Sequence, residues 1–367
     1  MHSLYIHIPF CKRKCFYCSF SISVGQEAKI DLYLDCLERE AILYKGKKIK
    51  TIYFGGGTPS LLTINQLKKL CKIVKKNFIF KRGAEWTIEI NPDGIDENKV
   101  DVLKFFGVNR FSLGAQSLND EYLKYLGRTH TAALVKEKFL LLKNKNIQNV
   151  SLDLMYGFPN QTMEELKKDV EAIVKLGADH LSLYSLDLEK GSRFYAKEIP
   201  MLDEQKQVKQ YTSVLKQLQH AGFMQYEISN FSRAKKESQH NICYWNGGNY
   251  IGLGVSAHSH IDGRRFWNVS KMAEYIKRSQ SIKCLVEGEE ILSVQQQLVE
   301  VILFGLRMNR GVCISKEEKR FGCLLNEQQK ELIEEAIKKG LFSQEEGVLK
   351  TGLQGRLVLD EFSARFV

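Results

Sequence analysis

Strand-like and helix-like segments alternate along the first 230 residues, and this alternation restricts the fold more than any other feature. Short runs of β-branched and apolar residues predict strands, and the amphipathic stretches between them predict helices. The predicted strands are residues 4–8, 51–54, 86–90, 110–113, 150–154 and 180–186, and the clearest predicted helices are residues 27–44, 64–76, 132–145 and 163–176. Repeated strand–helix units build a parallel sheet. We therefore predict an α/β fold with a partial (β/α)6 barrel over residues 1–230.

Beyond residue 230 the composition and the periodicity of the chain change. Residues 231–270 are rich in Asn, Gly, His and aromatic residues with weak periodicity, and we expect a connecting segment there. Residues 271–367 are expected to form a smaller helical domain, with helices at 294–308 and 326–339. Two β-like runs at 347–349 and 356–359 suggest a terminal hairpin, so we expect this domain to resemble a winged helix.

Composition narrows the classes of protein that fit. Hydrophobic residues make up 44% of the 367 residues and charged residues 26%, which is ordinary for a globular protein. No apolar run is long enough to span a bilayer, and no secretory signal precedes the first strand, so we expect a cytoplasmic protein. The net charge of +11 is compatible with peripheral contact with an anionic membrane. Basic residues form no stripe interleaved with stacking aromatics, which argues against nucleic-acid binding.

Three of the nine cysteines, Cys11, Cys15 and Cys18, lie within eight residues directly after the first predicted strand. A zinc site needs four ligands, and no second Cys or His pair lies nearby at a zinc-like spacing. Three thiolates on one loop can instead bind three irons of a [4Fe–4S] cluster and leave the fourth iron open. Such an iron can take the amino and carboxylate groups of S-adenosylmethionine. The other six cysteines are scattered, and we expect most of them to be small buried residues.

This spacing, with the aromatic Tyr17 before the last cysteine, resembles the radical SAM superfamily. Gly55-Gly56-Gly57-Thr58-Pro59 follows the second predicted strand, and Glu89 ends the third, where that superfamily binds its ligand. Motifs around Tyr5, Gln116, Arg128 and Asp153 further resemble the oxygen-independent coproporphyrinogen III oxidase family over nearly the whole chain. The residues that this resemblance assigns to the S-adenosylmethionine pocket are Tyr5, Tyr17, Gly56, Gly57, Thr58, Glu89, Gln116, Arg128 and Asp153. Arg128 would pair with the ligand carboxylate, and Glu89 or Asp153 would hold the ribose hydroxyls or the amino group.

Two departures weigh against the oxidase activity of that family. Phe20 stands where the oxidase has a further cysteine, and only ten residues precede Cys11, where the oxidase has a longer N-terminal segment. In addition, His240-Asn241-Ile242-Cys243-Tyr244-Trp245 is similar to the HNxxYW signature of a sister group, the heme chaperones. The resemblance implies that His240 contacts heme, with Cys243 as a second candidate ligand. His258 and His260 are expected to be pocket-wall residues rather than ligands.

The main hypothesis is therefore a heme chaperone with a [4Fe–4S] cluster and S-adenosylmethionine. Its cofactors and cargo would be the cluster, S-adenosylmethionine and heme, and no residue is assigned a catalytic role. The resemblance implies heme-acceptor proteins, plausibly of the respiratory chain, an electron donor such as flavodoxin or ferredoxin, and a homodimer. The alternatives are an oxygen-independent coproporphyrinogen III oxidase and another radical reaction on a tetrapyrrole, such as opening of the heme ring.

Overall fold

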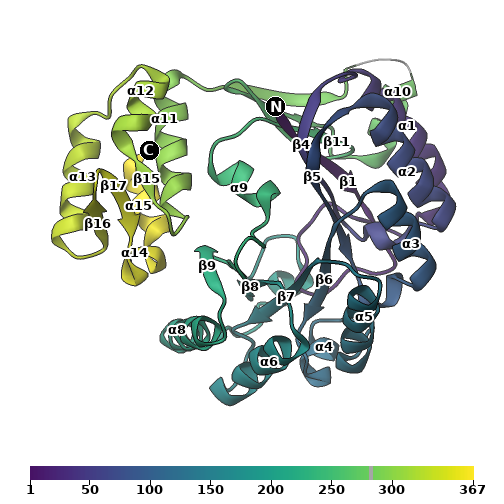
Figure 1. Ribbon diagram of the computed structural model, residues 1–367, viewed down its shortest axis with the longest axis horizontal. Coiled ribbons are helices and arrows are strands. Elements are labelled where there is room, and N and C mark those ends of the chain that lie inside the picture. Colours follow the sequence, from purple (N-terminus) through teal and green to yellow (C-terminus); the bar gives the residue numbers. More distant parts are fainter. Residues whose placement is uncertain (281–283) are drawn as a thin grey trace.

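A computed structural model describes residues 1–280 and 284–367 of the chain. Its centre is a sheet in which six parallel strands follow one another in the order β1-β4-β5-β6-β7-β8. These strands are β1 (His2–Ile8), β4 (Lys48–Gly56), β5 (Ile79–Ile90), β6 (Arg110–Gln116), β7 (Asn149–Tyr156) and β8 (His180–Ser185). Figure 1 shows them as an open arc. The predicted α/β fold with six parallel strands is confirmed, although most strands are longer than the sequence pattern indicates.

Helices cover the outer face of this arc (Figure 1). They are α1 (Ile30–Ile42), α2 (Ile64–Asn77), α3 (Glu97–Phe106), α4 (Asp120–Tyr125), α5 (Ala132–Asn144), α6 (Met163–Leu176) and α8 (Glu204–His220). The short helix α7 (Arg193–Ala196) instead lies against the first loop, where the Phe194 N–H donates to the Phe16 carbonyl. Short 3-10 turns are η1 (Glu27–Lys29), η2 (Pro59–Leu61) and η3 (Pro92–Gly94). Capping boxes start α2 at Thr63 and α6 at Thr162, where each threonine accepts a backbone N–H three residues on. The sequence thus specifies where these helices begin.

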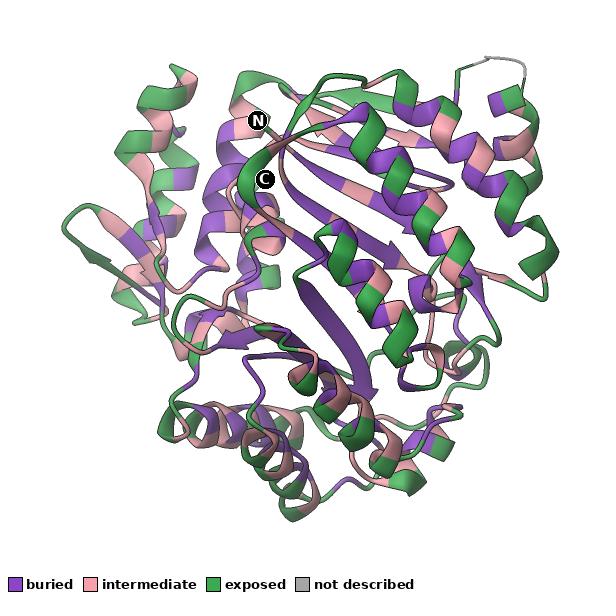
Figure 2. Cartoon of the chain, turned by 45° about the vertical axis from the view of Figure 1, so that its right-hand side comes forward, coloured by how far each residue is buried: buried purple, intermediate pink, exposed green. Residues whose placement is uncertain are grey.

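The main apolar core fills the space between the strands and the outer helices. Figure 2 shows most of the central parallel strands buried and the outward helix faces exposed, although the first half of β5 is largely exposed. Leu4, Phe54, Phe111 and Leu152 on four different strands are completely buried in this core. Polar and apolar residues alternate along these strands, so the apolar side chains enter this core and the polar ones, such as Ser112 and Asp153, face the inner side of the arc.

The sheet continues beyond the six parallel strands at both ends. At the β8 end it adds β10 (Asn230–Ser232) and β9 (Met224–Glu227). At the β1 end it adds β11 (Tyr250–Leu253), which is parallel to β1, and then the antiparallel strands β12 (His258–Ile261), β13 (Arg264–Asn268) and β14 (Val286–Ile291). We call β11–β14 the sheet extension. The domain boundaries at residues 230 and 270 stay a prediction, but the expected connecting segment contributes strands to the main sheet.

Two helices belong to this second half of the sheet. α9 (Gln239–Trp245) lies on the inner side of the arc, as Figure 1 shows, and α10 (Met272–Gln280) packs against α1. The short strands β2 (Phe10–Cys11) and β3 (Ser23–Val24) pair beside the first loop. Among the described residues, no helix is long and apolar enough to cross a membrane.

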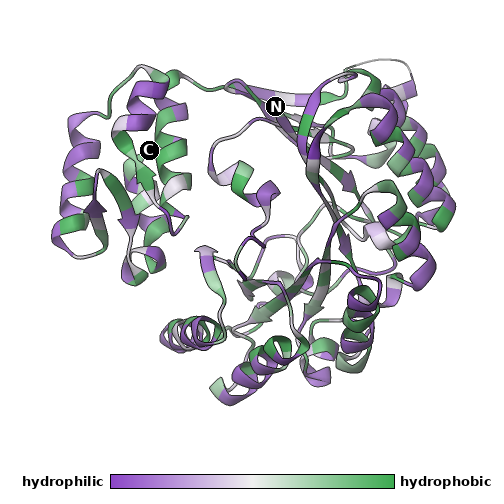
Figure 3. Ribbon diagram, viewed as in Figure 1, coloured by the Kyte–Doolittle hydropathy of each residue, from purple (hydrophilic) through white to green (hydrophobic). Residues whose placement is uncertain are grey.

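The C-terminal domain has an apolar core of its own, made of buried residues between Leu298 and Phe366. Its elements are α11 (Val294–Leu306), β15 (Val312–Cys313), α12 (Ile314–Phe321), α13 (Glu327–Lys338), β16 (Phe342–Glu345), β17 (Val348–Thr351), α14 (Leu353–Leu357) and α15 (Leu359–Phe366). Figure 3 shows hydrophobic residues gathered along α11, which packs into this core.

One sequence-based expectation for this domain is wrong. Residues 356–359 were expected to form the second strand of the hairpin, but they lie in α14 and α15. The actual hairpin pairs β16 with β17 around a tight turn at Glu346 and Gly347, which both have positive φ. Leu359, Phe362 and Phe366 recur at helical spacing and fill the core, and this burial overrides the β-like local composition.

Candidate functional site

A cavity of about 500 Å³ opens at the carboxyl ends of the parallel strands, where barrels of this type carry their chemistry. We call it the first cavity. Eleven residues predicted from the sequence line it, and only Tyr5 and His240 of the thirteen predicted site residues do not. Those that line it are Cys11, Cys15, Tyr17, Cys18, Gly56, Gly57, Thr58, Glu89, Gln116, Arg128 and Asp153. The structure therefore gathers residues from five different strand ends around one space.

The three cysteines of the first loop share this cavity. Cys11 ends β2 and is buried, while Cys15 and Cys18 are half-buried. The Cys18 N–H donates to the Cys15 carbonyl, which closes the loop into a turn. The pKa of the Cys11 thiol is raised to about 11, mainly by burial and to a smaller extent by the nearby Cys18 and Cys15, although Thr58 and Arg128 act in the opposite direction.

The donor set fits a cluster better than a single ion. All three thiols are free, line one cavity and are close enough to influence the ionisation of Cys11. Yet within residues 1–280 and 284–367, no three His, Cys, Asp or Glu side chains converge on a point that could hold one metal ion. Three separated thiolates suit a cubane, in which each thiolate binds a different iron.

Arg128 connects the cysteine loop to the strand ends. Its guanidinium donates to the Cys15 sulfur at 3.5 Å, to the Asn91 side-chain oxygen at 2.7 Å and to the Gly114 carbonyl at 3.0 Å. Asn91 also donates to the Thr58 hydroxyl at 3.2 Å. Sequence reasoning did not assign Asn91 to the site, although its place directly after the third strand was a usable signal.

Two half-buried carboxyl groups face the same cavity from β5 and β7, the two strands on either side of β6. Glu89 accepts hydrogen bonds from the Tyr53 hydroxyl at 2.8 Å and from the Gly56 N–H at 3.1 Å. Burial raises the pKa of Glu89 to about 7, and the negative charge of Asp153 adds to the rise. Asp153 accepts from the Ser112 hydroxyl at 3.0 Å, and burial raises its pKa as well. Such a pair can hold an ammonium group or ribose hydroxyls inside the cavity.

The glycine-rich loop packs closely against the cysteine loop. The Gly57 N–H donates to the Ile8 carbonyl at 2.8 Å, and the Thr58 N–H donates to the Phe10 carbonyl at 2.9 Å. Gly56 has a φ of +111°, and a Cβ there would lie 2.4 Å from the His7 ring. Thr58 is thereby held 3.3 Å from the Cys11 sulfur.

Tyr5 and His240 lie outside the first cavity. The Tyr5 hydroxyl pairs with Nδ1 of His7 at 2.9 Å. His240 is only 1% exposed, and its Nδ1 and Nε2 are both hydrogen-bonded, to the Thr51 and Tyr244 hydroxyls at 2.9 Å each. Burial lowers the pKa of His240 to about 3, so the ring is neutral. The predicted contact of His240 with heme stays a prediction, and in this conformation neither ring nitrogen is available to an iron.

A larger cavity of about 1110 Å³ adjoins the first one. We call it the second cavity. One wall is the sheet extension, with Tyr250, His258, His260 and Arg265, and the opposite wall is α11, with Val301 and Phe304. Tyr5 and the α9 residues Tyr244 and Trp245 close one side. Phe20, Gly56 and Glu89 line both cavities, so the two spaces meet at these residues.

A partial α/β barrel with three cysteines at this spacing in its first loop, beside a polar cavity at the strand ends, is the arrangement of a radical SAM protein. Residues 5–173 match the radical SAM superfamily, and residues 292–358 match the HemN C-terminal domain. The chain is 34% identical over 378 residues to heme chaperone HemW of Bacillus subtilis, covering 100% of this chain and 99% of that protein. It is 36% identical over 344 residues to heme chaperone HemW of Lactococcus lactis, covering 93% and 90%. The chain therefore belongs to the heme chaperone HemW family of radical SAM proteins.

A solved structure agrees with this family assignment. Coproporphyrinogen III oxidase HemN from Escherichia coli, described as a radical SAM enzyme, matches with a TM-score of 0.88 at 25% identity. The match covers 99% of this chain and 89% of that chain. The fold of both the barrel and the C-terminal domain is thus shared with that protein.

Proposed function

We propose that this protein binds heme and transfers it to acceptor proteins, and that it carries a [4Fe–4S] cluster with an exchangeable S-adenosylmethionine. The observation that carries this proposal is the 34% identity, over the full chain, to a protein named heme chaperone HemW. The second cavity, with its aromatic walls beside the cysteine loop, supports it because a flat apolar macrocycle needs such a space.

In this proposal Cys11, Cys15 and Cys18 hold the cluster, which would supply an electron to S-adenosylmethionine. Arg128 and the two carboxyl groups Glu89 and Asp153 are charged groups that line the first cavity and could orient that ligand there. Tyr17, Gly56, Gly57, Thr58 and Gln116 complete its lining. Tyr5 lines the second cavity and not the first. It would therefore contact the ligand only where the two cavities meet, near Gly56 and Glu89.

The proposed partners follow from the same site. Lys12, Arg13 and Lys14 are exposed on the cysteine loop, and they favour docking of an acidic electron donor such as flavodoxin or ferredoxin. Heme-acceptor proteins, peripheral membrane contact and a homodimer stay predictions. The proposed acceptors would receive heme from the second cavity.

The test is a heme titration of the anaerobically reconstituted protein, followed by the Soret band, with transfer to an apo-globin as a generic acceptor. A parallel assay measures decarboxylation of coproporphyrinogen III with S-adenosylmethionine and a reductant. Saturable heme binding of about one heme per chain, transfer, and no decarboxylation are the expected results. Diffuse heme binding with no transfer would overturn the proposal.

The second candidate function is the oxygen-independent coproporphyrinogen III oxidase. The TM-score of 0.88 with HemN, an oxidase of that name, favours it. Phe20 argues against it, because this residue is 67% exposed at the junction of the two cavities and replaces the further cysteine of the oxidase. Steady decarboxylation in the assay above would establish the oxidase and reject the chaperone.

A further inference from the structure

The first cavity extends beyond the residues assigned to S-adenosylmethionine. Arg110 and His180 are the first residues of β6 and β8, at the ends of these strands farthest from the cysteine loop, and both line the cavity. Ser238, the N-cap of α9, and Asn241 on α9 line it from the inner side of the arc (Figure 1). We call these four residues the inner end of the first cavity.

Arg110 is a buried cation without a counter-ion. The residue is 2% exposed, and its guanidinium makes one hydrogen bond, from Nη1 to the Lys236 carbonyl at 2.9 Å. It forms no ion pair in the part of the chain that the structure describes. Its other two guanidinium nitrogens donate to no described protein atom, and neither is among the atoms that the fold closes off, so both open into the cavity.

The neighbouring groups do not supply the missing negative charge. Asp153 on the adjacent strand β7 accepts from the Ser112 hydroxyl with both oxygens, at 3.0 and 3.2 Å, and makes no ion pair with Arg110. His180 is neutral, because burial and then the charge of Arg110 lower its pKa well below the ordinary value. A guanidinium keeps its charge at any physiological pH, and an unpaired charge in a protein interior is destabilising. Arg110 therefore calls for an anion from outside the chain.

Asn241 supplies a second free donor at the inner end. Its backbone N–H donates to the Ser238 hydroxyl at 3.3 Å, which fixes the first turn of α9. Its side chain is half-buried, lines the cavity and forms no hydrogen bond with any described residue. Arg110 and Asn241 thus present a guanidinium and an amide N–H to one space, and these are donors that suit an oxyanion.

The charges around this space favour an oxyanion with a single negative charge. The other cations that line the cavity lie at or beside the cysteine loop and are Lys12, Arg13 and Arg128. The carboxyl groups of Glu89 and Asp153 face the same cavity, and they would repel a doubly charged phosphate. A carboxylate has one charge and two oxygens, which match the fork of one guanidinium.

The carboxylate of S-adenosylmethionine is not the expected anion. Arg128, the group proposed to pair with it, donates to the carbonyl of Gly114, which lies on β6 four residues from Arg110. Strand residues rise about 3.3 Å each, so Gly114 and Arg110 lie roughly 13 Å apart along β6. Because S-adenosylmethionine has one carboxylate, it cannot pair with both arginines.

We propose that Arg110 and Asn241 form a subsite for the carboxylate of a second small ligand, which binds in the first cavity together with S-adenosylmethionine. This subsite goes beyond the proposed heme function and does not depend on it. It also gives α9 a role in both cavities, because Tyr244 and Trp245 of the same helix line the second one.

The experiment titrates the wild-type protein with propionate and follows binding by saturation-transfer NMR of the probe. The cluster is reconstituted and kept oxidised, and S-adenosylmethionine is present in excess. Propionamide, which has nearly the same shape without the charge, is the matched control probe, and inorganic phosphate is tested as a competitor. Saturable propionate binding is expected, with no binding of propionamide and little competition by phosphate.

Three variants assign the binding to the inner end. Arg110→Gln should lose propionate affinity by about tenfold or more, because it removes a charge-assisted hydrogen bond, and Asn241→Ala by about threefold. Arg82→Gln, on the exposed part of the neighbouring strand β5, is the matched control and should keep wild-type affinity. Propionate should raise the unfolding temperature of the wild type and of Arg82→Gln but not that of Arg110→Gln.

A purely structural arginine would give a different pattern. If Arg110 served only to hold the Lys236 carbonyl, Arg110→Gln would unfold at a lower temperature and keep its propionate affinity, and the proposal would be overturned. If Arg110→Gln does not fold, unchanged propionate affinity in Asn241→Ala overturns it.

The probes themselves supply the remaining tests. No saturable propionate binding by the wild type, or equal binding of propionamide, overturns the subsite. Tighter binding of phosphate that depends on Arg110 overturns the carboxylate as the ligand class. Loss of the propionate signal when S-adenosylmethionine is added would show that the two ligands share one site, which also contradicts the proposal. Failure of the separate heme titration would reject the proposed function and leave this subsite unaffected.

Discussion

Gly56 is a residue near the cysteine loop whose backbone has little room for a side chain. Its φ of +111° disfavours any side chain, and a Cβ would overlap the His7 ring at 2.4 Å. Gly56→Ala should therefore lower the free energy of unfolding by about 2–3 kcal/mol and reduce cluster incorporation, because the loop also positions Thr58 beside Cys11. Urea unfolding and the iron content after reconstitution measure the two effects.

Gly83 is the matched control for this substitution. It also has a positive φ, +71°, but a Cβ there would meet no atom within 4 Å. Gly83→Ala should lower the free energy of unfolding by about 1–2 kcal/mol, through backbone strain alone, and leave cluster incorporation unchanged. Equal losses of iron in both variants would contradict the role given to the glycine-rich loop.

Glu40 is a buried carboxyl group whose titration should affect stability. It accepts hydrogen bonds from Tyr275 at 2.6 Å and from the Gly254 N–H at 2.8 Å, and burial nevertheless raises its pKa to about 7. The ordinary value is 4.5, so between pH 4.5 and 7 the folded state binds more protons than the unfolded state. The stability contributed by this group is therefore full below pH 4.5 and falls as the pH rises towards 7, by at most about 1.4 kcal/mol per pH unit.

The measurement is the slope of unfolding free energy against pH in the cluster-free protein. Glu40→Gln cannot titrate, so its slope between pH 4.5 and 7 should be less negative than that of the wild type. The variant should also be less stable at low pH, because an amide cannot accept from all of the same donors. Identical slopes in the two proteins would show that Glu40 titrates alike in the folded and unfolded states.

At the scale of elements, a buried side chain of α9 contacts the sheet directly. His240 bridges Thr51 on β4 to Tyr244 on the next turn of α9, and its ring lies 5.0 Å from that of Tyr53. His240→Ala should lower the free energy of unfolding by about 1–3 kcal/mol, because Thr51 and Tyr244 lose a buried partner. Chemical denaturation measures the loss, and the cluster absorbance should not change. Unchanged stability together with a lost Soret band would instead support His240 as the heme ligand.

Element by element, the sequence was most informative where burial and periodicity agree. The strand that begins at residue 110 and the helix at 163–176 were predicted within a few residues, because alternating apolar residues mark the strand and a capping residue marks the start of the helix. β11 and β12 were missed, since only their pairing with β1 and with one another makes them strands. Residues 356–359, at the junction of α14 and α15, were mistaken for a strand because the core contacts of these helices come from residues distant in sequence.

At the scale of the whole molecule, the motif residues predicted one cavity but not the other. Cysteine spacing and glycine-rich turns are local signals, so eleven of the predicted site residues do line the first cavity. The second cavity is formed by the sheet extension, α9 and the C-terminal domain, and no local pattern reveals that His260 and Phe304 line the same space. The second cavity can therefore be identified only from the tertiary structure.

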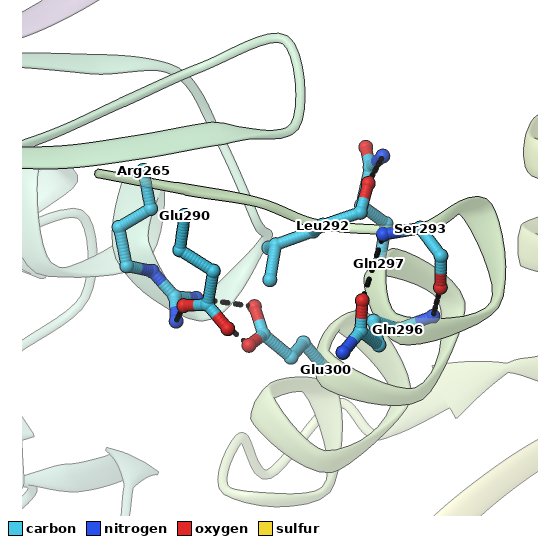
Figure 4. Close-up of polar contacts among 7 residues, drawn as sticks. All are labelled: Arg265, Glu290, Leu292, Ser293, Gln296, Gln297 and Glu300. Atoms are coloured by element: carbon cyan, nitrogen blue, oxygen red, sulfur yellow. Dashed lines mark hydrogen bonds and ion pairs between the residues drawn. The ribbon is translucent and has the colours of Figure 1, made fainter.

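The two walls of the second cavity are joined by an ion pair, shown in Figure 4. Arg265 on β13 contacts Glu300 on α11 at 2.6 Å and Glu290 on β14 at 3.4 Å. The connection between the walls is short, because the capping box of Ser293 and Gln296 starts α11 directly after Leu292. The side chains of Arg265 and Glu300 are each 27% exposed, so solvent only partly screens the pair. This contact should help to fix the C-terminal domain against the barrel.

A double-mutant cycle of Arg265→Ala and Glu300→Ala tests this role. The coupling energy in urea unfolding should be about 1 kcal/mol and should fall in 1 M salt. Limited proteolysis of the segment before α11 should also become faster in each single variant. Arg264 and Glu289 form the matched control pair, because they connect β13 to β14 within the sheet extension and are about half exposed. Their coupling should be smaller, and their loss should leave proteolysis of that segment unchanged, since that pair does not reach the C-terminal domain. If both cycles give the same coupling and neither alters proteolysis, apolar packing rather than the Arg265 ion pair holds the walls of the second cavity together.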